Sequence, residues 1–331
     1  MTQLTRRHVL AGAAAASAAT ALTPLANTPA FTAAPQAGKQ APGWYRYKVG
    51  SYEITVATDG KNTFKLPDTF VVNAKKDQVN EALAAAHMEK DMMTIPYSPI
   101  VINTGSKLVV MDTGTGEGNF ERSKGMGGQF HNNLKASGID RNAVDVVVIS
   151  HFHGDHINGL IGPENKPAFP NAEIMVPETE AAFWADESNT SKLPEVARGQ
   201  MGNVKRVFGI VNKVTKYQAG KELVPGITAI ASPGHTHGHH SHLITSGSGK
   251  LLVQADITAG MANLFVRNPD WQFVFDSDKA TAVTTRKKLY DMAAAEKMMV
   301  QGFHFPFPSR GYVEKSGNGY RLVPAPWNPA V

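Results

Sequence analysis

At its centre this 331-residue chain reads Ser150-His151-Phe152-His153-Gly154-Asp155-His156, directly after an apolar run at residues 144–149 that predicts a buried strand. Three imidazoles and a carboxylate would be costly to bury unpaired, and together they suit a divalent metal such as zinc. His151 and His153 lie two residues apart on extended chain, so their rings point to the same side. Asp155 and His156 follow a glycine that lets the chain turn. One segment can therefore serve two metal ions.

Three more candidate ligands follow other predicted strands. His235 comes after the strand at residues 227–231, Asp256 ends the one at 250–255, and His304 follows the one at 298–303. Asp112 ends a strand at residues 107–111 and is either a turn residue of the Asx type or a hydrogen-bond partner of a ligand. This recurrence of candidate ligands at strand ends is stronger evidence for a metal site than any single residue.

Together these motifs resemble the metallo-β-lactamase superfamily. Their order is His-x-His-x-Asp-His, a Gly-His-Thr-x-Gly-His loop at residues 234–239, an Asp at a strand end and a late His. Within the superfamily the chain is most similar to the methyl parathion hydrolase group of organophosphate and lactone hydrolases, through residues 41–46, 103–109, 111–114 and 168–172. The resemblance implies an α+β fold, a four-layer αββα sandwich, formed by one domain at residues 38–331.

The resemblance also implies two ligand sets that share one carboxylate: His151, His153 and His235 for one metal, Asp155, His156 and His304 for the other, and Asp256 bridging both. A hydroxide held between the ions would attack a lactone or aryl-ester carbonyl, or a phosphotriester phosphorus, with Asp155 and Asp256 as the catalytic carboxylates. Zinc is the expected ion, although such sites also accept Mn, Fe or Co. His239 would orient a ligand rather than bind metal.

Departures from relatives rank the possible activities. Ala259 stands where quorum-sensing lactonases of the superfamily carry a Tyr, which lowers the case for that activity without excluding it. Asp256 counts against a dedicated β-lactamase, and His153 counts against the di-iron redox members, which carry Glu there. A β-lactamase-like or thioester hydrolase on the same metal site is the alternative. A third hypothesis is a non-enzymatic metal-binding protein whose His-rich loop at residues 235–242 buffers zinc.

The substrate pocket is expected to be apolar, which favours an uncharged ester with aromatic or alkyl groups. Phe120 and Trp184 occupy places comparable to pocket aromatics of the methyl parathion hydrolase group; core packing or a dimer contact is the alternative. Trp184 follows Phe183 on one predicted helix, so at most one of these two side chains reaches the pocket. Further apolar candidates in the covering loops are Met201, Phe265 and Phe307.

The N-terminus resembles an export signal. Arg6 and Arg7 precede an Ala-rich uncharged stretch through residue 22, followed by small residues and prolines, as in a twin-arginine-type signal peptide. We expect residues 1–37 to be this leader and a flexible lead-in, and the mature protein to be periplasmic or secreted. An anchored helix is the alternative, but the apolar run is short for a span of about 20 residues. The sequence has no cysteine, which excludes disulfides and thiolate ligands.

Helices are predicted at residues 75–90, 120–137, 178–185 and 277–295, the last with Ser277 as its N-cap and Asp278 as an anion in its first turn. The net charge of +5 is spread over scattered basic residues, so the sequence shows no nucleic-acid-binding stripe. No stretch after the leader is long enough for a membrane span. The resemblance implies a homodimer with a small-molecule substrate. No role is assigned to six further histidines: His8, His87, His131, His237, His240 and His242.

Overall fold

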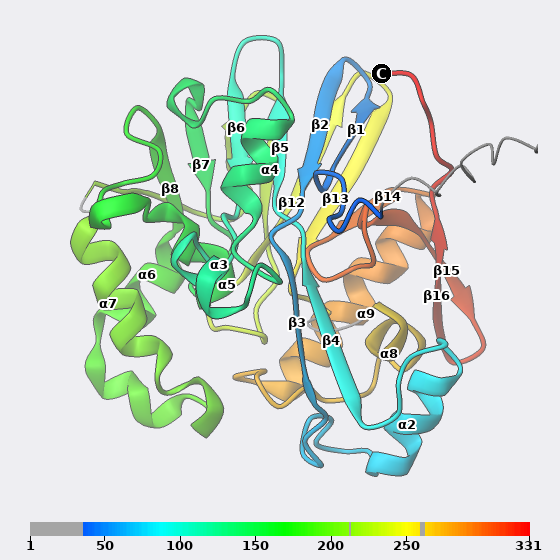
Figure 1. The fold of residues 1–331 in the computed structure, drawn as a ribbon. Helices are drawn as coiled ribbons and strands as arrows, with labels where there is room; N and C mark the ends of the chain where they lie inside the picture. Colours follow the sequence, from blue (N-terminus) through cyan, green and yellow to red (C-terminus); the bar gives the residue numbers. More distant parts are fainter. Residues whose placement is uncertain (1–35, 212, 259–261) are drawn as a thin grey trace, which may run out of the picture. The chain divides into compact units, whose positions relative to one another are not determined.

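The computed structural model describes residues 36–211, 213–258 and 262–331 (Figure 1). The chain divides into residues 1–41 and 42–331, and every helix and strand named below belongs to the second unit. The predicted leader lies almost wholly outside the described residues, and Ala259 lies outside them too. Within the described ranges, no helix has the length and apolar character needed to cross a membrane.

Seven strands form the first sheet in the order β1-β2-β5-β6-β7-β8-β9. Their bounds are Trp44–Val49, Tyr52–Ala57, Ile100–Asn103, Leu108–Met111, Val146–Val148, Glu173–Pro177 and Thr215–Tyr217. The strands from β1 to β6 pair antiparallel, whereas β6, β7, β8 and β9 run parallel to one another. The parallel strands therefore end at the same edge of the sheet, and the segment after β7 is the one that carries His151.

The second sheet runs in sequence order from β10 to β16. Its strands are Glu222–Val224, Ile227–Ala231, His240–Ser246, Gly249–Ala255, Met299–Gly302, Arg310–Ser316 and Gly319–Pro324. Every neighbouring pair is antiparallel except β13 and β14, which are parallel. Asp256 and His304 follow these two parallel strands, so both reach the same edge.

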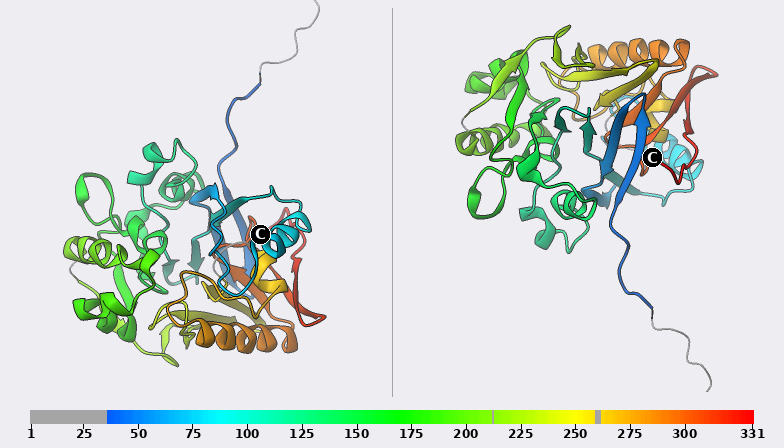
Figure 2. Two further views of the ribbon diagram at one scale, coloured as in Figure 1. Left: turned by 90° about the horizontal axis from the view of Figure 1, so that it is seen from below. Right: turned by 90° about the horizontal axis from the view of Figure 1, so that it is seen from above.

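The two sheets pack face to face through one apolar core. Ile54 and Val148 of the first sheet meet Ile244 and Leu251 of the second in this core. Helices α4 (Phe130–Ala136), α6 (Glu178–Ala185) and α7 (Gln200–Ile210) pack on the outer face of the first sheet. Helix α9 (Lys279–Ala295) covers the second sheet and lies along its strands in Figure 2. The predicted αββα sandwich is confirmed.

A two-stranded hairpin, β3 (Gly60–Lys65) and β4 (Met92–Tyr97), is missing from the sequence-based prediction. It packs with α2 (Lys76–Ala84) and α8 (Ala262–Arg267) around a separate cluster of buried side chains that includes Leu66, Leu83 and Phe265. Pro96 stands inside β4, and a proline demotes a run of residues when strands are predicted from sequence. The hairpin matters because β3 and β4 supply side chains to the cavity described below.

The predicted helix at residues 120–137 is wrong in its middle. The structure has two helices, α3 (Gly118–Arg122) and α4, separated by a turn in which Gly125 and Gly128 adopt positive φ. The carboxylate of Asp59 fixes this turn, since it accepts the N–H groups of Gly128 and Phe130. A long-range hydrogen bond to a buried carboxylate thus overrides the local helical pattern.

Two other helix ends differ from the prediction. Helix α2 ends at Ala84 rather than at residue 90, and the chain turns at His87, whose φ is +56°. Helix α9 begins at Lys279, and its N-cap is Asp278 instead of Ser277. The Asp278 carboxylate accepts the Thr281 N–H at 3.0 Å, which satisfies one of the free donors at the start of the helix.

We expect the substitution Asp278→Ala to lower the free energy of unfolding by about 1 kcal/mol, because it removes this cap. Ser277→Ala is the matched control and should change stability by less than about 0.5 kcal/mol, since the Ser277 side chain does not cap the helix. Urea denaturation of the three proteins measures the difference. Equal losses for the two variants would contradict the assignment of Asp278 as the cap.

Candidate metal centre

The seven predicted ligand residues follow the ends of four strands. β7 of the first sheet precedes the segment from His151 to His156, while β11, β13 and β14 of the second sheet precede His235, Asp256 and His304. The structure gathers them into three overlapping groups whose ligand atoms lie within 4.8 Å of one another: His151, His153 and His235; His151, His156 and Asp256; and Asp155, His156 and His304. All are buried except Asp155, which is partly exposed.

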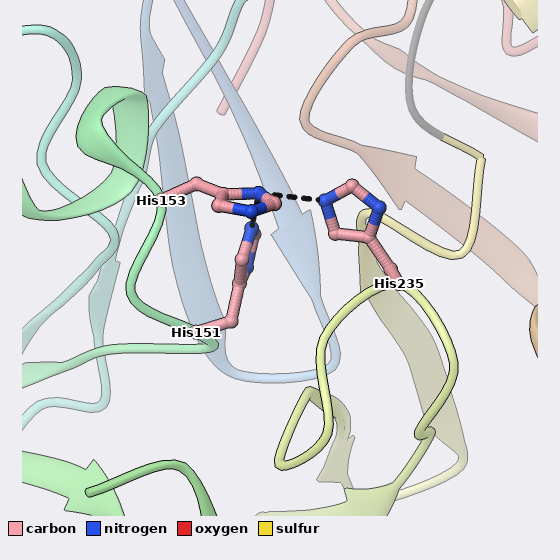
Figure 3. A group of neighbouring side chains, drawn as sticks. All are labelled: His151, His153 and His235. Atoms are coloured by element: carbon pink, nitrogen blue, oxygen red, sulfur yellow. Dashed lines mark hydrogen bonds between the residues drawn. The ribbon is translucent and has the colours of Figure 1, made fainter. Parts of the chain in front are cut away.

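In the first group, the three imidazoles converge on one point (Figure 3). Nδ1 of His153 lies 3.1 Å from Nε2 of His151 and 2.9 Å from Nε2 of His235. The ring planes of these three residues are nearly perpendicular to one another, with interplanar angles of 81° to 86°. Three nitrogens aimed at one point from three directions match three corners of a tetrahedral metal site.

Asp256 lies between the first group and the one formed by Asp155, His156 and His304, which is called the second group from here on. One of its oxygens, Oδ2, is 3.4 Å from Nε2 of His235 and 3.0 Å from Nε2 of His304, and the other, Oδ1, is 3.3 Å from Nε2 of His156. Asp155 approaches the two histidines of the second group from the other side, with Oδ2 3.7 Å from Nε2 of His156 and 3.6 Å from Nε2 of His304. A single carboxylate thus contacts both groups, as a bridging ligand would.

The outward nitrogens of three ligand histidines face fixed acceptors. Nδ1 of His156 donates to Asp112 at 2.9 Å, Nδ1 of His235 donates to Asp276 at 2.9 Å, and Nδ1 of His304 donates to the Pro96 carbonyl at 2.8 Å. Carboxylates and carbonyls only accept, so the proton of each neutral ring sits on Nδ1. Each ring therefore directs the lone pair of Nε2 inward, which is the form that binds metal.

His151 reaches the same state through a serine. Its Nδ1 lies 3.0 Å from Oγ of Ser150, and that hydroxyl donates to Asp112 at 2.8 Å. Because the serine proton is already committed to Asp112, its oxygen must accept from His151. Asp112 thereby supports one ligand of each group, and of the two interpretations drawn from the sequence, the structure shows the hydrogen bond to a ligand.

The inward-facing nitrogens and carboxylate oxygens of the ligand groups would be unfavourably placed without cations. Inward lone pairs face one another at about hydrogen-bond distance, and Nε2 of His156 and Oδ1 of Asp256 have no hydrogen-bond partner among the described residues. Buried polar groups left in this state are costly. A donor set of imidazole nitrogens and carboxylate oxygens suits zinc and similar divalent ions. The residues present therefore fit two such ions.

The protonation states of the ligands reflect the same crowding. Burial lowers the pKa of His151 and His153 well below its usual value, so both rings are neutral. Burial also acts to lower the pKa of His156, but neighbouring carboxylates, Asp256 first among them, outweigh it and hold that pKa well above its usual value. The pKa of His304 is raised in the same way. Metal ions would displace these protons, because a ligand must be unprotonated.

The loop that carries His235 is held by close backbone packing. A Cβ on Gly234 would collide with the backbone of Ala282 in α9, and a Cβ on Gly238 would collide with the backbone of Glu180 in α6. Nε2 of His239 accepts the N–H of Asp256 at 3.0 Å, so its lone pair is already engaged. His239 therefore holds the backbone of the residue that carries the shared carboxylate, and the two glycines let the loop lie between two helices.

The remaining histidines of this loop and of the strand after it belong to none of the ligand groups. His237 is exposed and stacks on Phe183 at 3.9 Å between ring centroids, while Nδ1 of His240 lies 2.8 Å from the Gly238 carbonyl. Nε2 of His242 is 3.1 Å from the hydroxyl of Tyr217 in the sandwich interior. These side chains have packing partners of their own.

A cavity of about 340 Å³ opens onto the ligand groups. His153, Asp155, His235, Asp256 and His304 contribute to its floor. Its apolar lining residues are Phe64, Ile95, Tyr97, Phe273 and Phe275, and its polar lining residues outside the ligand groups are Asn62, Thr115, Asn119, Arg122, Asn158 and Gln200. The volume lies within the range of small-molecule binding sites. The cavity can place a substrate with one apolar and one polar part against the ligands.

The predicted pocket residues Phe120 and Trp184 are not among the residues that line this cavity. Trp184 is only 2% exposed and donates its indole N–H to Glu180, and Phe120 packs against the turn at Gly125. The other candidates also lie elsewhere: Met201 and Phe265 are buried in apolar clusters, and Phe307 is exposed. Core packing, the alternative drawn from the sequence, describes Trp184.

Sequence reasoning missed several residues that matter for the site. Asp276, the acceptor for His235, lies 3.7 Å from the buried guanidinium of Arg286, and no motif marks it. Tyr97 lies edge-on to His304, with 5.7 Å between ring centroids, and its strand escaped prediction. Glu180, fully buried on α6, is a third case. Only Asp276 had a usable signal, an acidic residue just before a predicted helix, and this signal is weak.

Residues 95–295 match the metallo-beta-lactamase superfamily. The chain belongs to this superfamily. All seven ligand residues except His304 lie inside the matched region. The four-layer fold and the paired ligand groups described above agree with that membership.

Known relatives within the superfamily include lactonases. The chain is 29% identical over 170 residues to an N-acyl homoserine lactonase of Bacillus sp.. The aligned region is 51% of this chain and 59% of that protein, so the chain spans about three fifths of this curated relative. Among solved structures, it resembles AidC, a dizinc quorum-quenching lactonase, with 26% identity and a TM-score of 0.79 over 86% of this chain and 98% of that one. It also resembles the hydrolase AbOPH, with 27% identity and a TM-score of 0.78 over 88% of this chain and 100% of that one.

These relatives refine the resemblance drawn from the sequence. The superfamily is confirmed, but the curated relative described above is named an N-acyl homoserine lactonase and not a methyl parathion hydrolase. Ala259, in place of the Tyr of quorum-sensing lactonases, lowers the case for acyl-homoserine lactone hydrolysis in particular, whereas the curated relative is an N-acyl homoserine lactonase.

The sandwich interior yields a pH-dependent prediction. Burial lowers the pKa of His242 from 6.5 to about 3, so the folded protein excludes a proton that the unfolded chain binds. Its contribution to stability is complete above about pH 6.5 and is lost as the pH falls from there toward 3. At pH 5 the loss is about 2 kcal/mol relative to pH 7. We expect His242→Gln to remove this part of the pH dependence when urea unfolding is compared at pH 7 and pH 5.

Exposed His87 provides the control for this measurement. His87→Gln should leave the difference between pH 7 and pH 5 as it is in the unmodified protein. A His242→Gln protein whose stability falls between pH 7 and pH 5 as much as that of the unmodified protein would contradict the prediction.

Proposed function

We propose that this protein is a dinuclear metal-dependent hydrolase that opens lactones and related esters. The observation that carries the proposal is the position of Asp256, whose two oxygens contact both ligand groups at the floor of a substrate-sized cavity. AidC, which this chain resembles, is a dizinc lactonase, and zinc is therefore the ion we propose.

In this proposal the ligand residues act as predicted from the sequence. His151, His153 and His235 would hold one ion, Asp155, His156 and His304 would hold the other, and Asp256 would serve both. Bound ions would supply a hydroxide nucleophile at neutral pH and a Lewis acid for the electrophilic oxygen. Asp155 is 25% exposed and lines the cavity, so its carboxylate can also hydrogen-bond the attacking water or the leaving group.

The cavity walls bear on the substrate class. The aromatic and aliphatic residues of the lining suit an acyl or aryl group, and its amides and Arg122 suit an ester or amide dipole. An N-acyl homoserine lactone combines both features, and the Bacillus relative is a lactonase for such compounds. Phosphotriester hydrolysis stays in the proposal because of the resemblance to the methyl parathion hydrolase group. We also propose export through the twin-arginine-type leader.

Two alternatives use the same residues. A β-lactamase-like or thioester hydrolase would employ the same metal centre on another carbonyl substrate. A zinc buffer would need neither a shared carboxylate nor a cavity above it, and the separate packing of His237, His240 and His242 removes the extended His-rich surface on which that hypothesis depends.

The substrate prediction is tested by kcat/KM of the zinc-loaded protein on four compounds: N-hexanoyl-L-homoserine lactone, dihydrocoumarin, methyl parathion and a β-lactam. We expect one of the two lactones to give the highest value, because the cavity and the lactonase relatives agree on that class. A clear preference for the β-lactam would contradict the proposal. Turnover of none of the four by protein with two bound ions would do so as well.

The bridging carboxylate is tested by Asp256→Asn, which keeps the shape of the side chain and removes its charge. We expect kcat/KM on the preferred lactone to fall by about 100-fold or more, since Asp256 serves both ions. Asp68→Asn is the matched control at an exposed carboxylate and should leave kcat/KM unchanged. If Asp256→Asn kept full activity with two ions bound, the bridging role would be wrong.

A further inference from the structure

Glu180 is a buried carboxylate for which the proposed chemistry has no use. It is the third residue of α6, its exposed fraction is 0%, and it is not among the residues that line the cavity. Burying a carboxylate is costly unless hydrogen bonds compensate for the lost water. The partners of Glu180 therefore show what the residue is for.

Four donors surround the Glu180 carboxylate, two on each oxygen. Oε1 accepts the backbone N–H of Phe152 at 3.0 Å and the indole N–H of Trp184 at 2.7 Å. Oε2 accepts the hydroxyl of Thr236 at 2.8 Å and the backbone N–H of Gly238 at 2.8 Å. Three of these partners, the N–H groups of Phe152, Trp184 and Gly238, can only donate, so both oxygens of Glu180 are needed as acceptors.

The four hydrogen bonds compensate in part for the burial of the Glu180 carboxyl group. Burial raises the pKa of Glu180, and the hydrogen bonds from Trp184, Phe152, Thr236 and Gly238 oppose that rise. Both oxygens of Glu180 are thus fully engaged in hydrogen bonds.

The donors come from the two segments that carry the first ligand group. Phe152 lies between His151 and His153, and Thr236 directly follows His235. Gly238 packs so closely on the Glu180 backbone that a Cβ there would collide with it. One carboxylate therefore joins the backbone of the His151–His153 segment to the backbone of the His235 loop.

The second ligand group is held by residues other than Glu180. His156 is held by Asp112, and His304 is held by the Pro96 carbonyl. Asp155 and Asp256 also lie outside the set of Glu180 partners. A substitution of Glu180 should thus change the position of the His151–His153 segment relative to the His235 loop before it changes the second group.

We propose that Glu180 is a positioning residue that sets His151 and His153 against His235, and so fixes the affinity of one of the two metal sites. The inference rests on the proposed function, because it takes these three histidines to bind a metal. Trp184, predicted as a pocket aromatic, supports the Glu180 carboxylate instead.

The test is Glu180→Gln, which preserves shape and replaces one acceptor oxygen by an NH₂ group. Wherever that amide turns, its N–H atoms face at least one backbone or indole N–H, so one segment is released. We expect the affinity of the site formed by His151, His153 and His235 to fall by about 10- to 100-fold, with the other site nearly unchanged. Titration of the metal-free protein with Co²⁺, followed by calorimetry and visible absorption, resolves the two sites.

Asp59→Asn is the matched control. Asp59 is also fully buried and also accepts four hydrogen bonds, but from Thr115, Gly128 and Phe130, which belong to neither ligand segment. We expect this variant to lose thermal stability and to bind two Co²⁺ ions with the affinities of the unmodified protein. A site-selective loss in Glu180→Gln that Asp59→Asn does not share supports a positioning role.

Other outcomes separate the possible failures. Two unchanged Co²⁺ affinities in Glu180→Gln would overturn the inference and leave the proposed function intact, and equal weakening of both sites would do the same. Failure of the unmodified protein to bind two Co²⁺ ions would overturn the proposed function itself. If Glu180→Gln does not fold, Thr236→Val removes a single donor and should weaken the same site by a smaller factor. No change in that variant's affinities would overturn the inference.

Discussion

The structure depends on how seven ligand side chains, all buried except Asp155, share one small volume. Their outward atoms are committed to acceptors such as Asp112, Asp276 and the Pro96 carbonyl, so lone pairs and carboxylate charges face one another inside. Without cations, that arrangement leaves Nε2 of His156 and Oδ1 of Asp256 with no partner among the described residues. Two divalent ions would satisfy the inward atoms and link the two sheets, which is why metal binding and fold are coupled in this account.

The sandwich creates this volume through the ends of its strands. β7 delivers the His151 segment from one sheet, and β13 and β14, the parallel pair in the other sheet, deliver Asp256 and His304. Helices α6 and α9 then fix the His235 loop, because Gly238 packs on the first and Gly234 on the second. The apolar core between the sheets keeps these ends in register. The same packing of sheets and helices that forms the fold therefore positions the ligand residues and the cavity beside them.

Sequence patterns predicted the ligand residues and the fold better than they predicted the residues that hold the ligands in place. Closely spaced histidines and an aspartate at a strand end can be recognised along the chain, and so can the apolar runs that form buried strands. Asp276 and Glu180 could not be recognised in this way, because each acts across tens of residues and neither belongs to a motif. Phe120 and Trp184 failed as pocket residues for the same reason: the direction of an aromatic ring depends on tertiary partners, here Glu180 for Trp184. The hairpin β3–β4 escaped because Pro96 interrupts its pattern.

The most direct test of the account is a crystal structure of the zinc-loaded protein with anomalous diffraction data collected at the zinc absorption edge. We predict two anomalous peaks about 3.5–4 Å apart, one among His151, His153 and His235 and one among Asp155, His156 and His304, with Asp256 contacting both. A single peak, or two peaks away from these side chains, would contradict the dinuclear centre on which the proposed function depends.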